Sequence, residues 1–414
     1  MKNNWEKKKI GELCKLSQGL AINVKTKHYL VEKSDLPLLR IKDLKNNTVE
    51  QYVDPNNYPK NCLVTEKDLI YTRTGQIGLV FTGRFGILHN NSFKIEPDKS
   101  LLREYLFLFL QSESFKNQIL KLASRTAQPD ITHKIFKEQI IFVPPISEQK
   151  RIVAILDEAF EGIDRAIANT ENNLTNSREL FESYRNSILT QNNKEWKETT
   201  LGAEIDLMTG FPFKSSGYTD SDQSIRLLRG DNIVQGALRW DDVKKWPESE
   251  INEYLSYQLK EGDVVLAMDR PWVKAGLKHA MISSDDLPCL LVQRTACLRG
   301  NKNINNRFLI YLIGSHSFIQ HILSNQTGIG VPHISGKQIQ SFKFLKPFLS
   351  EQNFISDSLD DLRSKSQRLE TIYRQKLAAL NELKQSILQK AFTGELTADT
   401  PNQVRKTAKE GIAA

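Results

Sequence analysis

Arginine, asparagine and glutamine side chains gather in short stretches of this sequence that also contain glycine or proline. Residues 73–76 read Arg-Thr-Gly-Gln, and residues 269–274 read Asp-Arg-Pro-Trp-Val-Lys. Arginine can donate two hydrogen bonds to guanine, while asparagine and glutamine pair in the same way with adenine. A tryptophan can contact bases or wedge between them. Together the stretches predict contacts with DNA, although each residue taken singly fits a solvated loop as well.

The candidate DNA-binding residues lie in two separate parts of the chain. Arg40 and Arg229 each follow a Leu-Leu pair, whereas Gly75 and Gly78 more simply serve turns. The sequence does not separate phosphate contacts from base contacts. The candidates are Arg40, Lys42, Arg73, Thr74, Gln76, Arg84 and Asn90 in the first part, and Arg229, Arg270, Trp272, Lys274 and Arg294 in the second.

Motifs for catalysis are missing from the sequence. It has no G-x-G-x-x-G loop for a methyl donor or dinucleotide and no intact nucleotide-binding P-loop. Pro129-Asp130 could begin a nuclease core, but no Glu-x-Lys follows at a usable distance. The four cysteines form no Cys-x-x-Cys pair, which argues against a zinc site or a disulfide framework. We expect no enzymatic activity, metal or cofactor in this chain.

The net charge of +8 is concentrated in one part of the 414 residues. Residues 1–146 contain 23 Lys and Arg against 15 Asp and Glu, whereas residues 195–347 contain 18 against 17. A basic excess favours nucleic acid as a partner. There is no apolar run near 18 residues and no apolar segment behind the N-terminal Met-Lys-Asn-Asn-Trp, so we expect a reducing, cytoplasmic protein.

The second half of the chain repeats the first. From residue 101 to 157 the copies align without a gap at a numbering difference of 203. A repeat of this length is a duplicated module and not a solenoid, whose repeats are roughly 20–50 residues long. Shared residues include Leu106 and Leu309, Phe115 and Phe318, Ile119 and Ile322, Pro129 and Pro332, Lys134 and Lys337, and Pro144 and Pro347.

Each copy ends in a segment with heptad spacing, introduced by Pro-x-x-Ser-Glu-Gln. Ser147 and Ser350 are predicted to begin the helices, and Gly394 to end the second. Each helix would be roughly 60 Å long, and pairing as an antiparallel coiled coil would cover its apolar stripe. The predicted seams are Phe160, Ile167, Leu174, Phe181 and Ile188 with Leu156, Ile163, Thr170, Ser177 and Tyr184, and Leu359, Ser366, Tyr373, Leu380 and Ile387 with Leu362, Leu369, Lys376 and Leu383.

The globular parts mix short apolar runs with Gly, Asn and Asp. Strands are predicted at Leu36–Ile41, Asp68–Tyr71, Leu79–Phe81 and Asp263–Ala267, and helices at Leu101–Leu122 and Asn305–Leu323. The expected fold class is α/β (α+β), with two β-rich mixed recognition domains joined by two long helices. The predicted domains are residues 1–146 and 195–347, the helices 147–194 and 348–396, and a flexible tail 397–414.

This arrangement resembles the specificity subunit of Type I restriction-modification enzymes. The resemblance extends from residue 1 to about 396 and is most specific at Pro144–Ile155, Gly262–Pro271 and Leu380–Leu396. In the second helix, Asn353-Phe354-Ile355 departs from the family pattern of a basic residue before Ile.

The resemblance implies two target recognition domains that read a bipartite, asymmetric site in double-stranded DNA, with the helices as a ruler. It also implies two methyltransferase subunits and two restriction-translocase subunits as partners, and no membrane. The methyl donor, ATP and Mg²⁺ would belong to those partners. Two other functions stay open on the residues alone: a coiled-coil adaptor without DNA reading, and a stand-alone DNA methyltransferase or nuclease.

Overall fold

The computed structural model describes residues 5–124, 129–191, 193–325 and 332–397. The chain divides into two compact units, residues 1–171 with 374–414, and residues 172–373. Each unit contains one mixed α/β domain and part of both long helices. Residues 398–414 lie outside the described residues, and with them most of the predicted tail.

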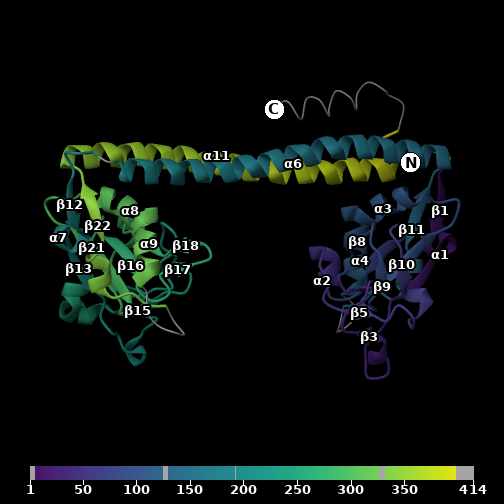
Figure 1. Cartoon of the computed structure of the whole chain (residues 1–414), viewed down its shortest axis with the longest axis horizontal. Helices are drawn as coiled ribbons and strands as arrows, with labels where there is room; N and C mark the ends of the chain where they lie inside the picture. Colours follow the sequence, from purple (N-terminus) through teal and green to yellow (C-terminus); the bar gives the residue numbers. More distant parts are fainter. Residues whose placement is uncertain (1–4, 125–128, 192, 326–331, 398–414) are drawn as a thin grey trace. The chain divides into compact units, whose positions relative to one another are not determined.

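The first domain is built on small sheets flanked by short helices (Figure 1). Strands β2, β10, β7 and β8 form an antiparallel four-stranded sheet in that order. A three-stranded sheet has the order β4-β9-β6 with β4 and β9 parallel, and β1–β11 and β3–β5 form pairs. The strands are β1 Glu6–Lys9, β2 Cys14–Gln18, β3 Leu30–Val31, β4 Leu38–Leu39, β5 Tyr52–Val53, β6 Leu63–Val64, β7 Leu69–Thr72, β8 Val80–Phe81, β9 Gly86–Leu88, β10 Ser92–Pro97 and β11 Ile140–Val143; the helices are α1 Ile10–Leu13, η1 Lys27–Tyr29, α2 Ile41–Asn46, η2 Lys60–Cys62, α3 Arg103–Gln111, α4 Glu113–Ala123 and α5 His133–Lys137.

The second domain repeats this plan. Its four-stranded sheet has the order β13-β21-β16-β19, its three-stranded sheet β15-β14-β20 again contains one parallel pair, and β12 pairs with β22. A hairpin of β17 and β18 is added. The strands are β12 Lys197–Thr200, β13 Ile205–Thr209, β14 Ser224–Leu228, β15 Lys244–Pro247, β16 Val264–Ala267, β17 Trp272–Val273, β18 Gly276–Leu277, β19 His279–Met281, β20 Cys289–Leu291, β21 Thr295–Gly300 and β22 Lys343–Lys346; the helices are α7 Leu201–Glu204, η3 Ser215–Gly217, η4 Glu248–Tyr257, η5 Ser284–Asp286, α8 Asn306–Gly314, α9 His316–Asn325 and α10 Gly336–Gln340.

Three predicted strands are confirmed, because β7, β8 and β16 lie within one residue of the predicted ranges or inside them. The predicted strand Leu36–Ile41 is partly wrong, since β4 is limited to Leu38–Leu39 and Ile41 begins α2. The two predicted domain helices are wrong in one respect, since each is broken into two at a serine. Ser112 separates α3 from α4, and Ser315 separates α8 from α9. Each hydroxyl accepts a hydrogen bond from the N–H three residues on, at 3.4 and 3.3 Å, and so begins a new helix.

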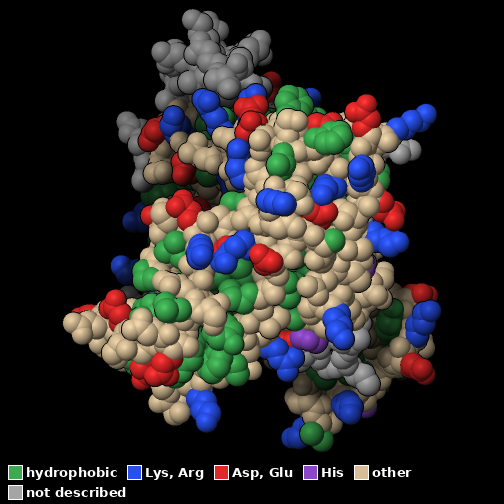
Figure 2. All heavy atoms as spheres, turned by 90° about the vertical axis from the view of Figure 1, so that its left-hand side faces the viewer, with side chains coloured by type: hydrophobic (Ala, Val, Ile, Leu, Met, Phe, Trp, Pro, Cys, Tyr) green, Lys and Arg blue, Asp and Glu red, His purple; other side chains and the backbone are tan. Residues whose placement is uncertain are grey.

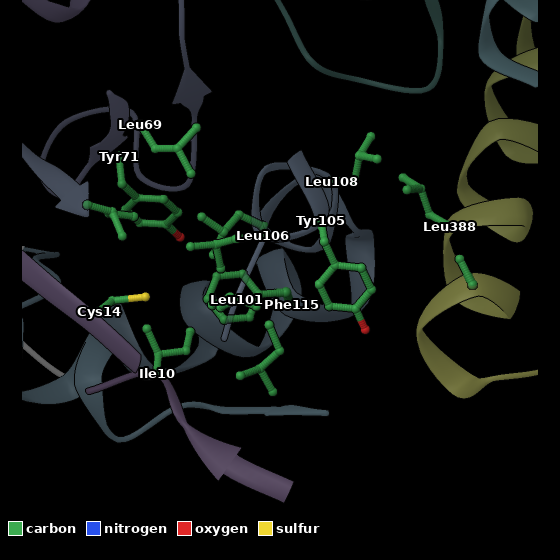
Figure 3. Packing of buried hydrophobic residues seen from close by; sticks show 14 of the residues in the cluster. Ile10, Cys14, Leu69, Tyr71, Leu101, Tyr105, Leu106, Leu108, Phe115 and Leu388 are labelled. Atoms are coloured by element: carbon green, nitrogen blue, oxygen red, sulfur yellow. The ribbon is translucent and has the colours of Figure 1, made fainter. Parts of the chain in front are cut away.

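The core of the first unit joins the domain to both long helices, α6 (Ile146–Leu189) and α11 (Leu349–Thr393). Tyr71, Phe93 and Phe115 of the domain belong to one buried cluster with Leu156 of α6 and Leu388 of α11. Figure 3 shows Leu388 facing the domain's buried residues Leu108 and Tyr105. The second unit has an equivalent core, in which Phe308 and Phe318 pack with Ile188 of α6 and with Leu359 of α11.

The two long helices run antiparallel within each unit. In the first unit Lys384 bonds Asp164 at 2.8 Å. In the second, Arg178 bonds Glu370 at 2.8 Å, and Asn193, just beyond the end of α6, bonds Glu351 in the first turn of α11 at 3.5 Å. Residue numbers therefore rise along one helix as they fall along the other, which confirms the predicted pairing. None of the described helices is long and apolar enough to cross a membrane.

The predicted starts of the long helices are wrong by one residue. Helix α6 begins at Ile146 and α11 at Leu349, so Ser147 and Ser350 lie inside the first turn. At α11, the Glu351 carboxylate accepts a hydrogen bond from the Phe348 N–H at 3.0 Å, which satisfies the backbone ahead of the helix. Gly394, with φ of 84°, follows the last residue of α11 as predicted.

The predicted seams are partly wrong. Leu156, Phe160, Ile163, Thr170 and Ser177 are buried, but Tyr184 is exposed and its neighbour Arg185 is buried instead. On α11, Leu359, Ser366 and Leu380 are buried, whereas Lys376, Leu369 and Leu383 are exposed. Within each unit the domain packs against the long helices and so displaces the buried stripe from an ideal heptad seam.

One glutamine in each unit ties the beginning of the long helix to the domain. Gln149 is fully buried, and its Oε1 accepts from the Leu102 N–H at 2.6 Å. Its Nε2 donates to the carbonyl oxygens of Ser100 and Pro144 at 2.9 and 2.8 Å.

Gln352 repeats these three bonds at the second helix. Its Oε1 accepts from the Asn305 N–H at 2.8 Å, and its Nε2 donates to the carbonyls of Asn303 and Pro347, both at 3.0 Å. Every partner is displaced by the same 203 residues as in the first unit. We call these two sets of contacts the glutamine joints, and they explain why the Ser-Glu-Gln motif occurs twice.

Replacing either joint glutamine should destabilise its own unit. Gln149→Ala or Gln352→Ala leaves one N–H and two carbonyls without their partner, so we expect a loss of about 2–4 kcal/mol in the free energy of unfolding. Urea titration followed by hydrogen exchange of peptides from each unit measures this. Gln375→Ala, at an exposed position of α11, is the matched control and should change stability by less than about 0.5 kcal/mol. Equal effects of all three variants would contradict the joint.

Candidate nucleic-acid interface

The predicted residues of the first domain meet where three strands end. Arg73 follows β7, and its N–H donates to the Asn91 carbonyl at 2.9 Å. The N–H of His89, after β9, donates to the Leu39 carbonyl at 3.1 Å, just before Arg40. Residues 40–42, 73–76 and 89–91 therefore form one edge, here called the first loop edge. It contains Arg40, Lys42, Arg73, Thr74, Gln76 and Asn90.

Acidic partners already hold some of these cations. The Arg40 guanidinium bonds the buried Asp43 carboxylate at 2.8 Å and Glu50 at 2.7 Å. The bond to Asp43, followed by that to Glu50, raises the pKa of Arg40. Lys42 pairs with the same Glu50. The two side chains brace α2 at the loop edge, and Glu50 offsets part of their charge.

Arg73 is also paired. Its Nε donates to Asp130 Oδ1 at 2.9 Å, and Nη2 bonds the other carboxylate oxygen, which is a bidentate contact. Burial, followed by the charge of Arg73, lowers the pKa of the nearby His133. Thr74 Oγ1 is buried and has no hydrogen-bond partner among the described residues.

Arg84 lies apart from this edge. Its Nη2 donates to the Leu44 carbonyl at 3.2 Å, near the end of α2. Its Nε is buried without a hydrogen-bond partner among the described residues. The side chain of Arg84 therefore contacts the backbone of α2 and does not belong to the first loop edge.

The second domain forms a corresponding edge from residues 229–231, 269–274 and 293–294, here called the second loop edge. The Met268 N–H donates to the Arg294 carbonyl at 2.9 Å, and Arg294 Nη1 lies 3.4 Å from Asp269 Oδ1. The Val292 N–H donates to the Leu228 carbonyl, next to Arg229, at 3.1 Å. The structure thus brings together all five predicted residues, Arg229, Arg270, Trp272, Lys274 and Arg294.

Two arginines of the second loop edge have left-handed backbone, Arg270 with φ of 45° and Arg294 with φ of 66°. Arg270 occupies the position of Gly75, because Thr74 bridges Asp130 and Asp269 bridges His333 in the same way. Gly75 has φ of 71°. Left-handed backbone costs a residue with a side chain roughly 1–2 kcal/mol, and such strain is concentrated at functional sites.

Sequence reasoning missed three polar residues at the second loop edge. Asp269 Oδ1 accepts from His333 Nδ1 at 2.6 Å when that nitrogen is protonated, and His333 aligns with Asp130 in the gapless part of the repeat. That alignment could have identified the pair. Lys278 follows the hairpin, and burial is the main cause that lowers its pKa, with Arg239 and Arg270 adding to it. No pattern in the sequence distinguishes Lys278 from other lysines.

Charge is mixed on the second domain. Figure 2 shows Lys and Arg interspersed with Asp and Glu on the face turned to the viewer. At the second loop edge, Arg229 forms an ion pair with Asp231 at 3.1 Å. Among the residues that the structure describes, no group of three or more His, Cys, Asp or Glu could hold a metal ion. The edges offer hydrogen-bond donors, acceptors and exposed cations, which suit binding to a polar, anionic polymer.

Comparison with known proteins identifies the class. The family described as Type I restriction modification DNA specificity domain matches residues 2–176 and again residues 176–379. The chain therefore belongs to this family, and the resemblance seen in the sequence is confirmed.

Curated relatives carry the same designation. The Type I restriction enzyme MjaVIII specificity subunit of Methanocaldococcus jannaschii is 27% identical over 414 residues, covering 96% of this chain and 94% of the relative. The EcoAI specificity subunit of Escherichia coli is 38% identical over 180 residues, covering 43% of this chain and 30% of the relative. This chain is a Type I specificity subunit, and the prediction of a non-catalytic subunit agrees with these relatives.

Solved structures share the fold. A chain from a structure of the type I R-M system has a TM-score of 0.77 at 19% identity, covering 96% of this chain and 99% of that one. The HsdS subunit from Thermoanaerobacter tengcongensis has a TM-score of 0.56 at 20% identity, covering 96% and 98%. The predicted fold class, two mixed domains with two long antiparallel helices, is confirmed.

Arg270→Gly should separate stability from DNA binding. Glycine relieves the left-handed backbone, so we expect the free energy of unfolding to stay the same or rise by up to about 1 kcal/mol. Loss of the guanidinium should weaken binding to the target duplex by about tenfold or more, as for an arginine that contacts a base. Urea titration and fluorescence anisotropy with labelled duplex measure the two effects.

Lys302→Ala is the control for Arg270→Gly. Lys302 is an exposed cation that follows β21, whereas the second loop edge lies before the first residue of that strand. It should leave both quantities unchanged. Parent-like DNA affinity in Arg270→Gly would remove Arg270 from the interface.

Proposed function

We propose that this chain reads a bipartite, asymmetric sequence in double-stranded DNA, with one half read by each domain. The observation that carries this proposal is the pair of loop edges, which stand on equivalent strand ends in the two domains and present different residues. Arg73 and Asp130 face each other in one domain, and Met268 and His333 occupy those positions in the other. Two edges with different donors and acceptors would select different bases.

The candidate residues have two kinds of role in this proposal. Arg270, Lys274 and Arg294 have side chains at an exposed edge and would contact phosphates or guanine. Arg40 and Arg73 are paired with carboxylates, so they would contact DNA while those carboxylates hold their orientation. Gln76 is exposed and suits adenine, whereas Thr74, Asn90, Arg229 and Lys42 lie beside these groups at the loop edges.

The chain would also act as the scaffold of a Type I complex. Its internal repeat offers two equivalent sets of surfaces, which suits two copies of a methyltransferase subunit and two of a restriction-translocase subunit. The methyl donor, ATP and Mg²⁺ would be bound by those partners. Three further points stay predictions: a location in the cytoplasm, the domain limits and the individual DNA contacts. The match to specificity subunits favours this function over an adaptor without DNA reading or a stand-alone methyltransferase or nuclease.

Exchange of one domain tests bipartite recognition. Replacing residues 196–347 with those of another family member should change one half of the target and leave the other half and the spacer as they were. Mapping methylated adenines in DNA from cells that carry the chain and its methyltransferase subunit measures this. The reciprocal exchange of residues 1–146 is the matched control and should change the other half. A change of both halves in either exchange would contradict separate reading.

Lengthening the helix pair tests its proposed role as a ruler. Thr175 stands opposite Tyr373, as judged from the facing pair Arg178 and Glu370. Four residues inserted after each of these two positions add roughly 6 Å to both helices while keeping them paired. Two base-pair rises are about the same length, so the spacer should lengthen by one or two base pairs with both half-sites unchanged.

The same methylation map gives the result for the insertion variant. Insertion after Thr175 alone is the contrast, because it also shifts the heptad pattern of one helix against the other. An unchanged spacer with full activity in the paired insertion would show that the helices do not set the spacing.

A further inference from the structure

The second domain carries a projecting hairpin that the first domain lacks. Residues 267–278 connect Leu266 of β16 to His279 of β19, whereas residues 72–79 make the equivalent connection from Tyr71 to Val80. The second connection is four residues longer, and β17 and β18 occupy the added length. In the first domain the short connection buries Ile77 and exposes only the polar Gln76 and Gly75 at its tip.

The hairpin presents apolar and cationic groups side by side. Trp272 is 40% exposed and Val273 is 36% exposed, although both are large apolar side chains. Lys274 follows in the two-residue turn and is exposed. Arg270 precedes the hairpin, and Arg294 lies beside it through Asp269. An exposed aromatic side chain on the same loop edge as three cations suits a polyanion with flat apolar faces inside it, which is the chemistry of DNA.

Several backbone hydrogen bonds hold the hairpin in place. The Arg270 N–H donates to the Pro332 carbonyl at 2.7 Å, and the Lys278 N–H donates to the Pro271 carbonyl at 2.8 Å. Gln235 Nε2 donates to the Gly276 carbonyl at 3.3 Å. Leu277, directly opposite Trp272 in the hairpin, is buried in the domain core. The backbone that carries Trp272 is therefore positioned before any partner binds, which lowers the entropy lost on binding.

We propose that the β17–β18 hairpin enters a groove of the target duplex, where Trp272 contacts bases and Lys274 contacts a phosphate. This inference rests on the proposed function and adds to it a division of roles within one loop. The major groove is wide enough for a two-stranded ribbon, and apolar side chains there contact thymine methyl groups. Only the second half-site would be read in this way, because the first domain has no such hairpin.

Salt dependence separates the two roles. A phosphate contact contributes about one unit to the slope of log affinity against log salt, whereas a base contact contributes to discrimination between sequences. The complex of the chain with its methyltransferase subunits is titrated with the mapped target duplex and with duplexes that carry one changed base pair, at several salt concentrations.

Trp272→Ala should weaken target binding by about 10-fold to 100-fold, with an unchanged salt slope, and should lose discrimination at one position of the second half-site only. Trp272→Phe should keep most of the affinity. Lys274→Ala should lower the salt slope by about one and keep discrimination. Leu255→Ala, which removes another exposed apolar side chain of the same domain, should behave as the parent.

Each other outcome overturns the inference. If Trp272→Ala binds and discriminates like the parent, the hairpin does not read bases, while bipartite recognition stands. If Trp272→Ala instead fails to assemble with the methyltransferase subunits in gel filtration, the hairpin is a protein-docking surface. If the parent complex does not discriminate at either half-site, the proposed function itself is wrong. Because Trp272 is largely outside the core, the thermal unfolding midpoint of the Trp272→Ala variant should match that of the parent.

Discussion

Two buried glutamine carboxamides join the globular domains of this protein to its long helices. Gln149 and Gln352 each satisfy three backbone groups at the point where a domain passes into a long helix. A carboxamide can do this because it offers an acceptor and two donors in one plane. Neither a hydrophobic side chain nor a carboxylate has both, so the residue type follows from the polar groups that the joint buries. The direction in which each helix leaves its domain depends on this contact.

The two copies of the repeat share their sheets and glutamine joints but differ at the loop edges. The glutamine joints, the four-stranded sheets and the parallel strand pairs occur in both copies. At the loop edges the copies differ: Gly75 is replaced by Arg270 with its left-handed backbone, and a short turn is replaced by the longer Trp272 hairpin. Strain and exposed apolar surface are costs that a purely structural segment avoids. The presence of both at the second loop edge indicates that this edge is kept for binding and not for stability.

The sequence predicted the large features well, because they depend on long patterns. Heptad spacing in two long segments, the absence of Pro and Gly from residues 350–393 and a gapless repeat indicated two paired helices and two similar domains, and the structure has both. The details that were predicted wrongly depend on local contacts that compete with the apolar pattern. Ser112 and Ser315 cap new helices inside segments whose apolar spacing is helical throughout. Arg185 takes the buried position next to Tyr184 because the domain, and not only the partner helix, covers that side.

Site residues were harder to predict than the fold. The loops with Arg and Gln were located correctly in the sequence and do converge at strand ends, but composition could not reveal that Arg40 and Arg73 have carboxylate partners. Those partners, Asp43 and Asp130, are 3 and 57 residues away in the chain. Asp269 and His333 are separated by 64 residues, and only the alignment of the two copies, which sets His333 against Asp130, points to them. These two long-range pairs are set by the fold and leave no local pattern, whereas the contact of Arg40 with Asp43 depends on where α2 begins.

The central claim is that two different edges on one repeated frame read two different half-sites. Mapping every methylated adenine in DNA from cells that contain this chain and its methyltransferase subunit tests it most directly. The account predicts one motif with two unequal specified segments, separated by a constant number of unspecified base pairs. A single uninterrupted motif, or two identical halves arranged as a palindrome, would contradict it.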